Sequence, residues 1–175
     1  MKIKTLIENF MVVKTLINAS EGLSFSNKRK LVKMDNSGQK EIDNYVTALN
    51  NLVEPKGLEV IKQSSLLTPR IELKDKEKQK IYLSAYFKKE KERNPLEVEV
   101  YNEFFPKIKE IQKELEEEVE KETSEEIIIC ELTEEEIEKI RILEKRKKED
   151  ATEYDVAREL FGYEISFMEN LGMIK

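Results

Sequence analysis

The chain has 175 residues, which is enough for one domain with its own core. Charged residues and apolar residues each make up 39% of it, and this balance favours amphipathic helices over disorder, because a disordered chain lacks regularly spaced apolar residues. The net charge of −6 argues against non-specific adhesion to nucleic acid or anionic membranes, both of which reward clustered Lys and Arg.

Apolar residues near the N-terminus recur three and four apart, which predicts a helix ending near Asn18. They are Leu6, Phe10, Val13, Leu16 and Ile17. The segment Ser20-Glu21-Gly22 then interrupts the helical pattern.

A second, longer helix is predicted from about Asn27 to Val53, with Ser24 or Ser26 as its cap. The segment Asp35-Asn36-Ser37-Gly38 also favours a turn, so two helices that meet there are an alternative. Glu54-Pro55-Lys56-Gly57 ends the helix, because proline disfavours the helical conformation in the residue before it.

The segment from Leu58 to Leu73 is less regular, and either a small hairpin or an extended loop fits it. Asp75 can cap a helix from Lys76 to about Arg93. Leu96-Glu97-Val98-Glu99-Val100 alternates strictly, which predicts a half-buried strand.

Pro106 suits the first turn of a further helix. Its apolar residues form a thin stripe between many glutamates, and such a narrow stripe packs against one neighbour at most. The stripe consists of Ile108, Ile111, Leu115 and Val119. The sequence leaves open whether this Glu-rich helix at Lys107 to Lys121 lies free or pairs with another copy in a homo-oligomer.

The C-terminal third is predicted to begin with a buried strand at Ile127-Ile128-Ile129-Cys130. Thr133-Glu134-Glu135-Glu136 matches a capping box for a helix toward Lys148. Thr152-Glu153-Tyr154-Asp155 is a weaker box for a short helix that Gly162 closes. The apolar tail from Tyr163 to Ile174 must pack on the domain or on a partner.

These elements predict a mainly α fold of the α+β class, with five or six helices and a few short strands that can form a small antiparallel sheet. We expect a single domain over residues 1–175, with a sub-division into N-terminal helices at 1–54, a mixed region at 55–132 and C-terminal helices at 133–175.

The residue types needed for common catalytic sites are scarce. The chain has no histidine, and Cys130 stands in an apolar run where burial raises the pKa of a thiol. The glycines do not form a phosphate-binding loop. We therefore expect no enzyme activity, no cofactor and no metal, with an unrecognised carboxylate site as the remaining enzymatic alternative.

Two groups of residues are candidates for binding a partner. Lys28, Arg29, Lys30 and Lys33 have no acidic residue after them until Asp35, so they can contact phosphate or an acidic protein. Tyr82, Tyr86 and Phe87 lie next to a second basic cluster at Lys88 to Arg93 and could stack on bases.

The cellular location is predicted from the absence of targeting signals. No stretch approaches the roughly 18 consecutive apolar residues of a membrane span. Glu8 and Asn9 interrupt the apolar run that a signal peptide would need. We expect a cytoplasmic protein with no membrane partner.

The segment from Leu23 to Val53 resembles small uncharacterised proteins of phages and prophages of low-GC Gram-positive bacteria. The resemblance lies in Leu23 to Lys33, in Glu41-Ile42-Asp43-Asn44-Tyr45 and in Leu49 to Val53, and a short acidic-hydrophobic segment similar to Glu126-Ile127-Ile128-Ile129 follows in those proteins. It covers about a third of the chain, and the region from Ile71 to Phe105 and the extended C-terminal segment depart from it.

The resemblance implies a phage-encoded, non-enzymatic protein that binds another macromolecule, either as an accessory of virion assembly or as an inhibitor of a host defence protein. Its location would then be the host cytoplasm or the virion. The alternative is a regulatory protein associated with nucleic acid through the patch at Lys28 to Lys33.

Overall fold

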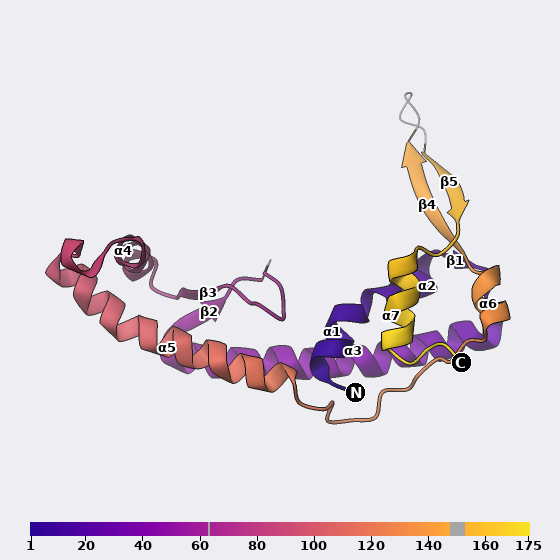
Figure 1. Ribbon diagram of the computed structural model, residues 1–175, viewed down its shortest axis with the longest axis horizontal. Coiled ribbons are helices and arrows are strands. Elements are labelled where there is room, and N and C mark those ends of the chain that lie inside the picture. Colours follow the sequence, from indigo (N-terminus) through magenta and orange to yellow (C-terminus); the bar gives the residue numbers. More distant parts are fainter. Residues whose placement is uncertain (63, 148–152) are drawn as a thin grey trace. The chain divides into compact units, whose positions relative to one another are not determined.

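The computed structural model describes residues 1–62, 64–147 and 153–175. Within them the fold is mainly helical, with seven α-helices and two small antiparallel sheets, so the predicted α+β class is confirmed (Figure 1). The chain forms two compact units: unit 1 contains Met1–Ile42 and Glu122–Lys175, and unit 2 contains Asp43–Lys121. The single domain expected over residues 1–175 stays a prediction.

The N-terminal apolar stripe forms two short helices instead of the one predicted, α1 (Ile3–Asn9) and α2 (Met11–Ala19). Phe10 lies between them in helical conformation, and the N–H of Val13 donates to its carbonyl at 3.1 Å, one residue short of the α-helical spacing. The stripe is buried as expected, with Leu6, Phe10 and Leu16 in the core of unit 1.

Helix α3 (Phe25–Val53) runs unbroken for 29 residues, so the alternative of a turn at Asp35 to Gly38 is wrong. Gly38 has a packing role instead. A Cβ atom on it would lie 2.3 Å from Cε2 of Phe10, so only glycine lets this buried ring lie against the helix. The helix ends as predicted, in a 3-10 turn (Glu54–Lys56) followed by Gly57 in the left-handed conformation.

In unit 2, the segment after Gly57 forms the small hairpin, in which β2 (Leu58–Val60) pairs antiparallel with β3 (Ile71–Leu73). Asp75 caps α4 (Lys76–Phe87) by accepting two backbone N–H bonds. The helix stops at Phe87, earlier than the predicted end near Arg93, and a 3-10 turn (Glu90–Glu92) follows.

The strand predicted at Leu96 to Val100 is wrong, because these residues form the start of α5 (Pro95–Val119). Asn94 accepts a bond from the N–H of Glu97, and the Glu97 carboxylate accepts one from the N–H of Asn94, both at 2.9 Å. The alternation of five residues favours a strand less than this capping box favours a helix. Pro106 therefore lies inside α5 and not in a first turn.

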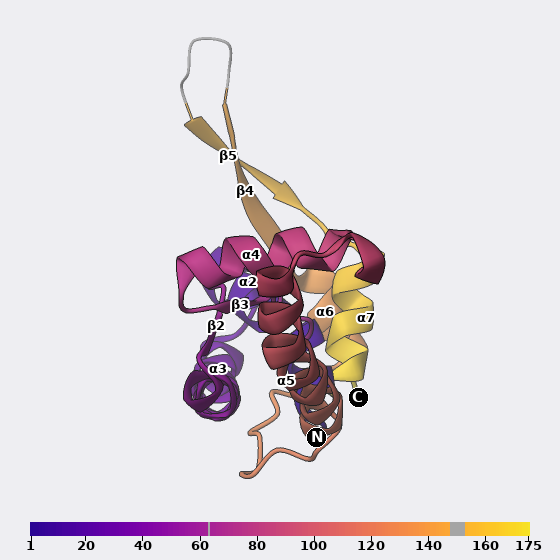
Figure 2. The same ribbon diagram turned by 90° about the vertical axis from the view of Figure 1, so that its left-hand side faces the viewer.

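The core of unit 2 is formed by α4, α5, the C-terminal part of α3 and the hairpin. Figure 2 shows α4 lying across the N-terminal end of α5. The buried apolar residues are Leu49, Val53, Leu58, Leu73, Tyr82, Val100, Phe104, Ile111 and Leu115.

In unit 1, Ile127 to Cys130 form no strand, which corrects the prediction of a strand buried on both faces. Ile127 and Cys130 are buried, whereas the intervening Ile128 is exposed. The capping box at Thr133 is confirmed, but its helix α6 (Glu134–Lys139) is short and ends well before Lys148.

The next segment is a hairpin of β4 (Arg141–Lys147) and β5 (Glu153–Arg158), so the helices predicted there are wrong. Thr152, the proposed cap of the second, lies outside the described residues. β4 also pairs with β1 (Ser20–Glu21), which gives the strand order β1-β4-β5. The hairpin stands out from the helices of its unit (Figure 1).

The apolar C-terminal segment packs on its own unit, through α7 (Gly162–Asn170) and the residues after it. Met168, Leu171 and Met173 are fully buried, and the N–H of Leu132 donates to the carbonyl of Met173 at 2.7 Å. In the described parts of the chain, no helix has both the length and the apolar character to cross a membrane.

Candidate partner-binding surfaces

The sequence-predicted binding residues fall into two groups that belong to different units. Lys28, Arg29, Lys30 and Lys33 lie in the first turns of α3 in unit 1, and we call them the basic patch. Tyr82, Tyr86 and Phe87 lie on α4 in unit 2. Each group therefore has to be considered as a surface of its own unit.

Helix α4 has one buried and one exposed apolar side. Tyr82 and Ala85 are buried, whereas Leu83, Tyr86 and Phe87 are 37%, 52% and 82% exposed. Residues three and four apart on a helix are neighbours, so these last three form one continuous stripe, which we call the α4 stripe. The sequence predicted Tyr86 and Phe87 in this surface but missed Leu83, and Tyr82 belongs to the core.

The rings of the α4 stripe continue a row of aromatic contacts that begins in the core. Phe105 stacks on Tyr101 with ring centres 4.8 Å apart, and Tyr101 stacks on Tyr82 at 6.0 Å. Tyr86 lies 6.1 Å from Tyr82, and Phe87 meets the edge of Tyr86 at 5.4 Å. Burial raises the pKa of Tyr82 to about 12, so its phenol stays neutral. Contact with the buried Tyr82 therefore holds the ring of Tyr86 in place, and Tyr86 in turn contacts Phe87.

The Glu97 carboxylate holds the C-terminal end of α4 to α5. It accepts bonds from Nζ of Lys88 at 2.6 Å and from Oγ of Ser84 at 2.7 Å, besides the cap bond of Asn94. The Lys88 ammonium, followed by the Ser84 and Asn94 donors, lowers the pKa of Glu97 to about 2. Lys88 is therefore a structural residue of the second basic cluster.

Among the described residues, the cationic groups of the basic patch lie outside ion-pair distance of carboxylates, and only Lys30 is near enough to an acidic residue to help lower its pKa, that of Glu136. In the part of the chain that the structure describes, none of its four cationic groups makes an ion pair or a side-chain hydrogen bond. On β4, by contrast, Lys145 and Lys147 both lie within 4 Å of the Glu153 carboxylate.

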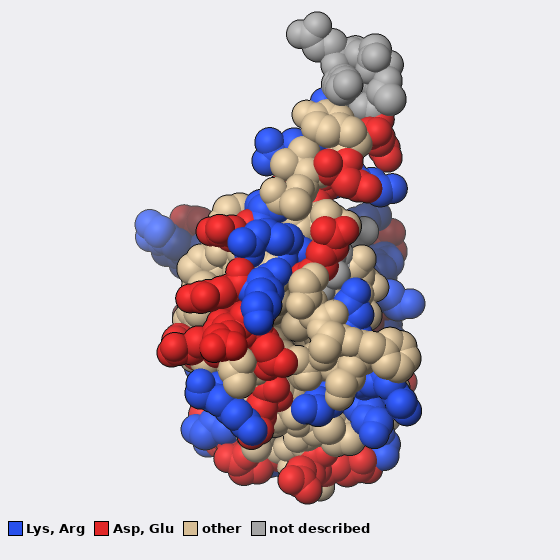
Figure 3. All heavy atoms as spheres, turned by 90° about the vertical axis from the view of Figure 1, so that its right-hand side faces the viewer, with Lys and Arg blue, Asp and Glu red and all other residues tan. Residues whose placement is uncertain are grey.

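Phe25 adds an aromatic ring to the basic patch, and the sequence reading missed it. Its side chain is 78% exposed in the first turn of α3. A hollow of about 390 Å³ is lined by Phe25, Ser26, Arg29, Lys30 and Lys33. Lys and Arg side chains gather beside uncharged ones in the lower part of the face shown in Figure 3. The sequence could have indicated this exposure, because Phe25 lies outside the apolar stripe of α3 that contains Leu31 and Met34.

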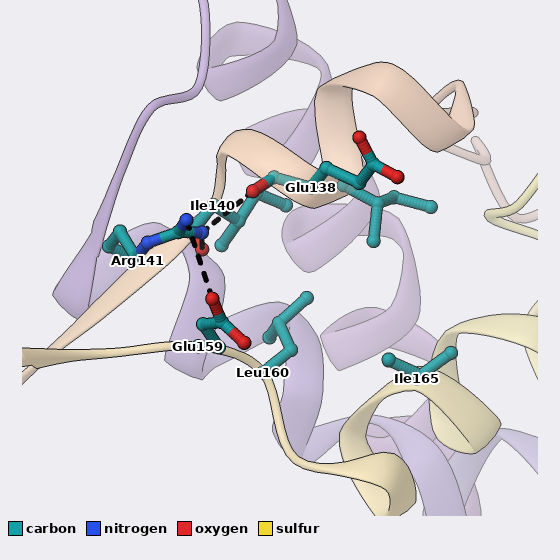
Figure 4. A pocket seen from close by; sticks show the side chains of 7 residues that line it. Glu138, Ile140, Arg141, Glu159, Leu160 and Ile165 are labelled. Carbon is teal, nitrogen blue, oxygen red and sulfur yellow. Dashed lines mark hydrogen bonds and ion pairs between the residues drawn. The ribbon is translucent and has the colours of Figure 1, made fainter.

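A second pocket, of about 410 Å³, lies in unit 1 between α6, the base of the hairpin and α7 (Figure 4). Its apolar wall is formed by Ile137, Ile140, Leu160 and Ile165. Nη1 of Arg141 donates to the carbonyls of Glu138 and Ile140, and Nη2 lies 3.6 Å from the Glu159 carboxylate. The arginine thus closes the rim, and the lining combines the apolar wall with the polar side chains of Glu138, Arg141 and Glu159.

A partly buried ionic cluster joins the hairpin to α7. Nη1 and Nη2 of Arg158 donate to the two carboxylate oxygens of Glu164 at 2.7 and 2.8 Å, and Nε donates to Glu144. The guanidinium also lies 3.8 Å from the ring centre of Phe161. Arg158 lowers the pKa of Glu164, so the pair stays ionised and serves as a structural link.

Cys130 is fully buried, and burial raises the pKa of its thiol, as the sequence predicted. Its Sγ lies 3.6 Å from the carbonyl of Asn27. Among the described residues, no three His, Cys, Asp or Glu side chains come together as a metal-binding group. Comparisons of the chain with models of protein families, with curated proteins and with solved structures found no match.

Proposed function

We propose that this chain is a non-catalytic protein that binds another protein, and that the α4 stripe is its principal contact surface. The observation that carries the proposal is the exposure of Leu83, Tyr86 and Phe87 side by side on one helix. Scattered exposed apolar residues need no explanation, but a continuous apolar patch is typical of a recognition site.

The composition and support of the stripe favour a protein as the partner. Aromatic residues are enriched at the centres of protein interfaces, where they supply large contact area with few rotatable bonds. Tyr86 is already positioned by its contact with the buried Tyr82, so little conformational entropy is lost when a partner binds.

The non-catalytic part of the proposal is supported by the chain's chemistry. The sequence has no histidine, and its one thiol is buried with a raised pKa. The two buried carboxylates with the clearest structural roles, Glu97 and Glu164, are held ionised by Lys88 and Arg158. A carboxylate kept ionised is a poor general acid.

The biological setting we propose is a phage or prophage, on the strength of the resemblance of Leu23 to Val53. Two roles fit a protein-binding surface in that setting, an accessory of virion assembly and an inhibitor of a host defence protein. A nucleic-acid-associated regulator is the second candidate function, and the unpaired cations of the basic patch are the observation that favours it.

The proposal is tested by affinity capture from the cell that makes the protein, using the wild type and a Leu83→Ser/Phe87→Ser variant. Met11→Ser is the matched control, because Met11 is also an exposed apolar residue but lies in unit 1. The captured protein is then purified, and its dissociation constant is measured by calorimetry. We expect the α4 variant to weaken binding by at least about tenfold, and the control to leave it unchanged.

Two outcomes would reject the proposal. One is a purified partner that binds the wild type and the Leu83→Ser/Phe87→Ser variant equally well. The other is turnover of a small molecule by homogeneous protein that is abolished by a single carboxylate substitution while the fold survives.

A further inference from the structure

The exposed side of the first turns of α3 combines apolar and cationic side chains in an ordered way. Phe25 and Val32 are 78% and 46% exposed. They are seven residues apart, about two helical turns, so both project from the same side of the helix. Lys28 and Arg29 follow Phe25 by three and four residues, and Arg29 precedes Lys33 by four. An apolar centre is thus flanked by cations on both sides.

This face is held firmly by the opposite side of the helix. Leu31 and Met34 are fully buried in the core of unit 1. Asn27 is buried as well, and its Nδ2 donates to the Glu136 carboxylate at 2.6 Å while its N–H donates to Oγ of Ser24 at 3.2 Å. The helix therefore presents Phe25, Val32 and the cations on a fixed backbone, and binding need not order it.

The charge of the face requires an explanation in an acidic chain. The protein carries 37 Asp and Glu against 31 Lys and Arg, and several other cations of unit 1 meet carboxylates, as Lys40 does with Glu125 and Lys175 with Glu131. Within the described residues, the cationic groups of Lys28, Arg29 and Lys33 meet none. Such a group of free cations attracts an anionic partner over about one Debye length, roughly 10 Å at 0.1 M salt.

We propose that this face, formed by Phe25, Lys28, Arg29, Val32 and Lys33, docks an acidic amphipathic helix of a partner protein. Apolar side chains at three-, four- and seven-residue spacing on that helix would cover Phe25 and Val32, and its flanking Asp and Glu would pair with the cations. The inference deepens the proposed protein-binding function, but it concerns a surface in the other unit and can fail by itself.

Two other occupants fit the face less well. Single-stranded nucleic acid could stack a base on Phe25, but stacking on an aromatic ring gives the aliphatic Val32 no matching contact. A second copy of this chain could offer its Glu-rich α5. The apolar residues Ile111, Leu115 and Val119 of that helix are already buried in unit 2, so it has no free apolar stripe.

The test measures binding of labelled probes to the full chain by fluorescence anisotropy. The probe is a peptide of about 18 residues, long enough to become helical, with Leu at helical spacing, Glu on both flanks and Ala elsewhere. The control peptide has Lys in place of every Glu, and an oligothymidylate of similar length represents nucleic acid. Sedimentation of the unliganded protein reports self-association.

We expect the acidic peptide to bind the wild type and the basic peptide not to. Lys28→Glu/Arg29→Glu/Lys33→Glu should weaken binding by at least about tenfold, and Phe25→Ser or Val32→Ser by roughly three- to tenfold. Salt raised from about 50 to about 300 mM should weaken it as well. Leu83→Ser/Phe87→Ser, in unit 2, should have no effect on this peptide.

The inference is overturned if the acidic peptide does not bind, or if the variants at Phe25 and Val32 bind it as well as the wild type does. It is also overturned if oligothymidylate alone binds with the same sensitivity to the charge reversals, or if the face proves to join two copies of the chain. Circular dichroism checks that each variant is folded, and Lys28→Gln/Arg29→Gln/Lys33→Gln repeats the test without adding negative charge. Loss of capture by Leu83→Ser/Phe87→Ser, with peptide binding intact, separates the two surfaces.

Discussion

Replacing Gly38 by alanine should destabilise the protein, although alanine is the better helix former. In the middle of an exposed helix, this change would raise the free energy of unfolding by about 1 kcal/mol. At Gly38 the new Cβ would lie 2.3 Å from Cε2 and 2.6 Å from Cζ of Phe10, where carbon atoms in contact are normally about 3.5–4.0 Å apart.

The size of the loss in unfolding free energy depends on how far the Phe10 ring can move. Phe10 is buried between α1 and α2, so it cannot turn into solvent and the helices must shift to accommodate the methyl group. Overpacking of this kind costs about 1–3 kcal/mol, and the overlap of more than an ångström favours the upper half of that range. After the gain in helix propensity, we expect the free energy of unfolding to fall by about 1–2 kcal/mol, which corresponds to a melting temperature lower by roughly 2–8 °C.

Urea unfolding followed by circular dichroism measures this difference. Gly162→Ala is the matched control, because Gly162 begins α7 and no atom lies within 4 Å of a Cβ there. It should be neutral, or stabilising by up to about 1 kcal/mol. In a Phe10→Leu background the cost of Gly38→Ala should shrink by about 1 kcal/mol or more, because the ring edge is gone. If Gly38→Ala stabilises the wild type as Gly162→Ala does, Phe10 does not pack on this glycine.

Three further predictions concern acid stability, thiol reactivity and helix capping. The pKa of Glu97 is lowered from 4.5 to about 2, so the stability that this carboxylate contributes is complete above pH 4.5 and is lost as the pH falls toward 2. The difference in unfolding free energy between wild type and Glu97→Gln should therefore shrink over that range, and a difference independent of pH would contradict the low pKa. Cys130 should react with a thiol reagent at pH 8 at least about a hundredfold more slowly in the native protein than in urea, and equal rates would contradict its burial. Asn94→Ala should lower the free energy of unfolding by about 1 kcal/mol through loss of the α5 cap, whereas a segment that began as a strand would lose nothing.

The parts of the fold that could be read from the sequence are those fixed by neighbouring residues. The cap of α4 at Asp75, the capping box at Thr133 and the stop at Gly57 all involve residues at most four apart along the chain. The long periodicity of α3 also outweighed the turn-like segment at Asp35 to Gly38, because its apolar stripe continued on both sides. Short-range geometry of this kind is present in the order of the residues.

The errors have two causes, a pairing that is distant in the sequence at β4 and a local pattern that concealed a helix cap at α5. β4 becomes a strand because it pairs with β1 through Ser20 and Ile142, and with β5 across a hairpin whose apolar positions do not alternate clearly. At the start of α5, the Asn94 and Glu97 box was present in the sequence, but the alternation of Leu96 to Val100 obscured it.

The candidate surfaces show the same division. Two features could be recognised in the sequence itself, the basic run Lys28-Arg29-Lys30 and the aromatic pair Tyr86-Phe87. The charge and size of a side chain do not depend on its surroundings. Tyr82, read with that pair, turned out to be buried, whereas Phe25 and Leu83 were passed over and are exposed. Exposure depends on which side of a helix meets the core.

The sequence by itself determined where α3, α4 and α6 begin, the helical class of the fold and the absence of histidine chemistry, since these follow from residue types and from contacts within one or two turns. Only the tertiary structure decided that Gly38 accommodates Phe10, that residues 141–158 turn into a hairpin, and that Leu83, Tyr86 and Phe87 stay uncovered on α4. Those outcomes depend on which distant segments exclude water together, and the apolar contacts formed in doing so outweigh local preferences of a kcal/mol or less.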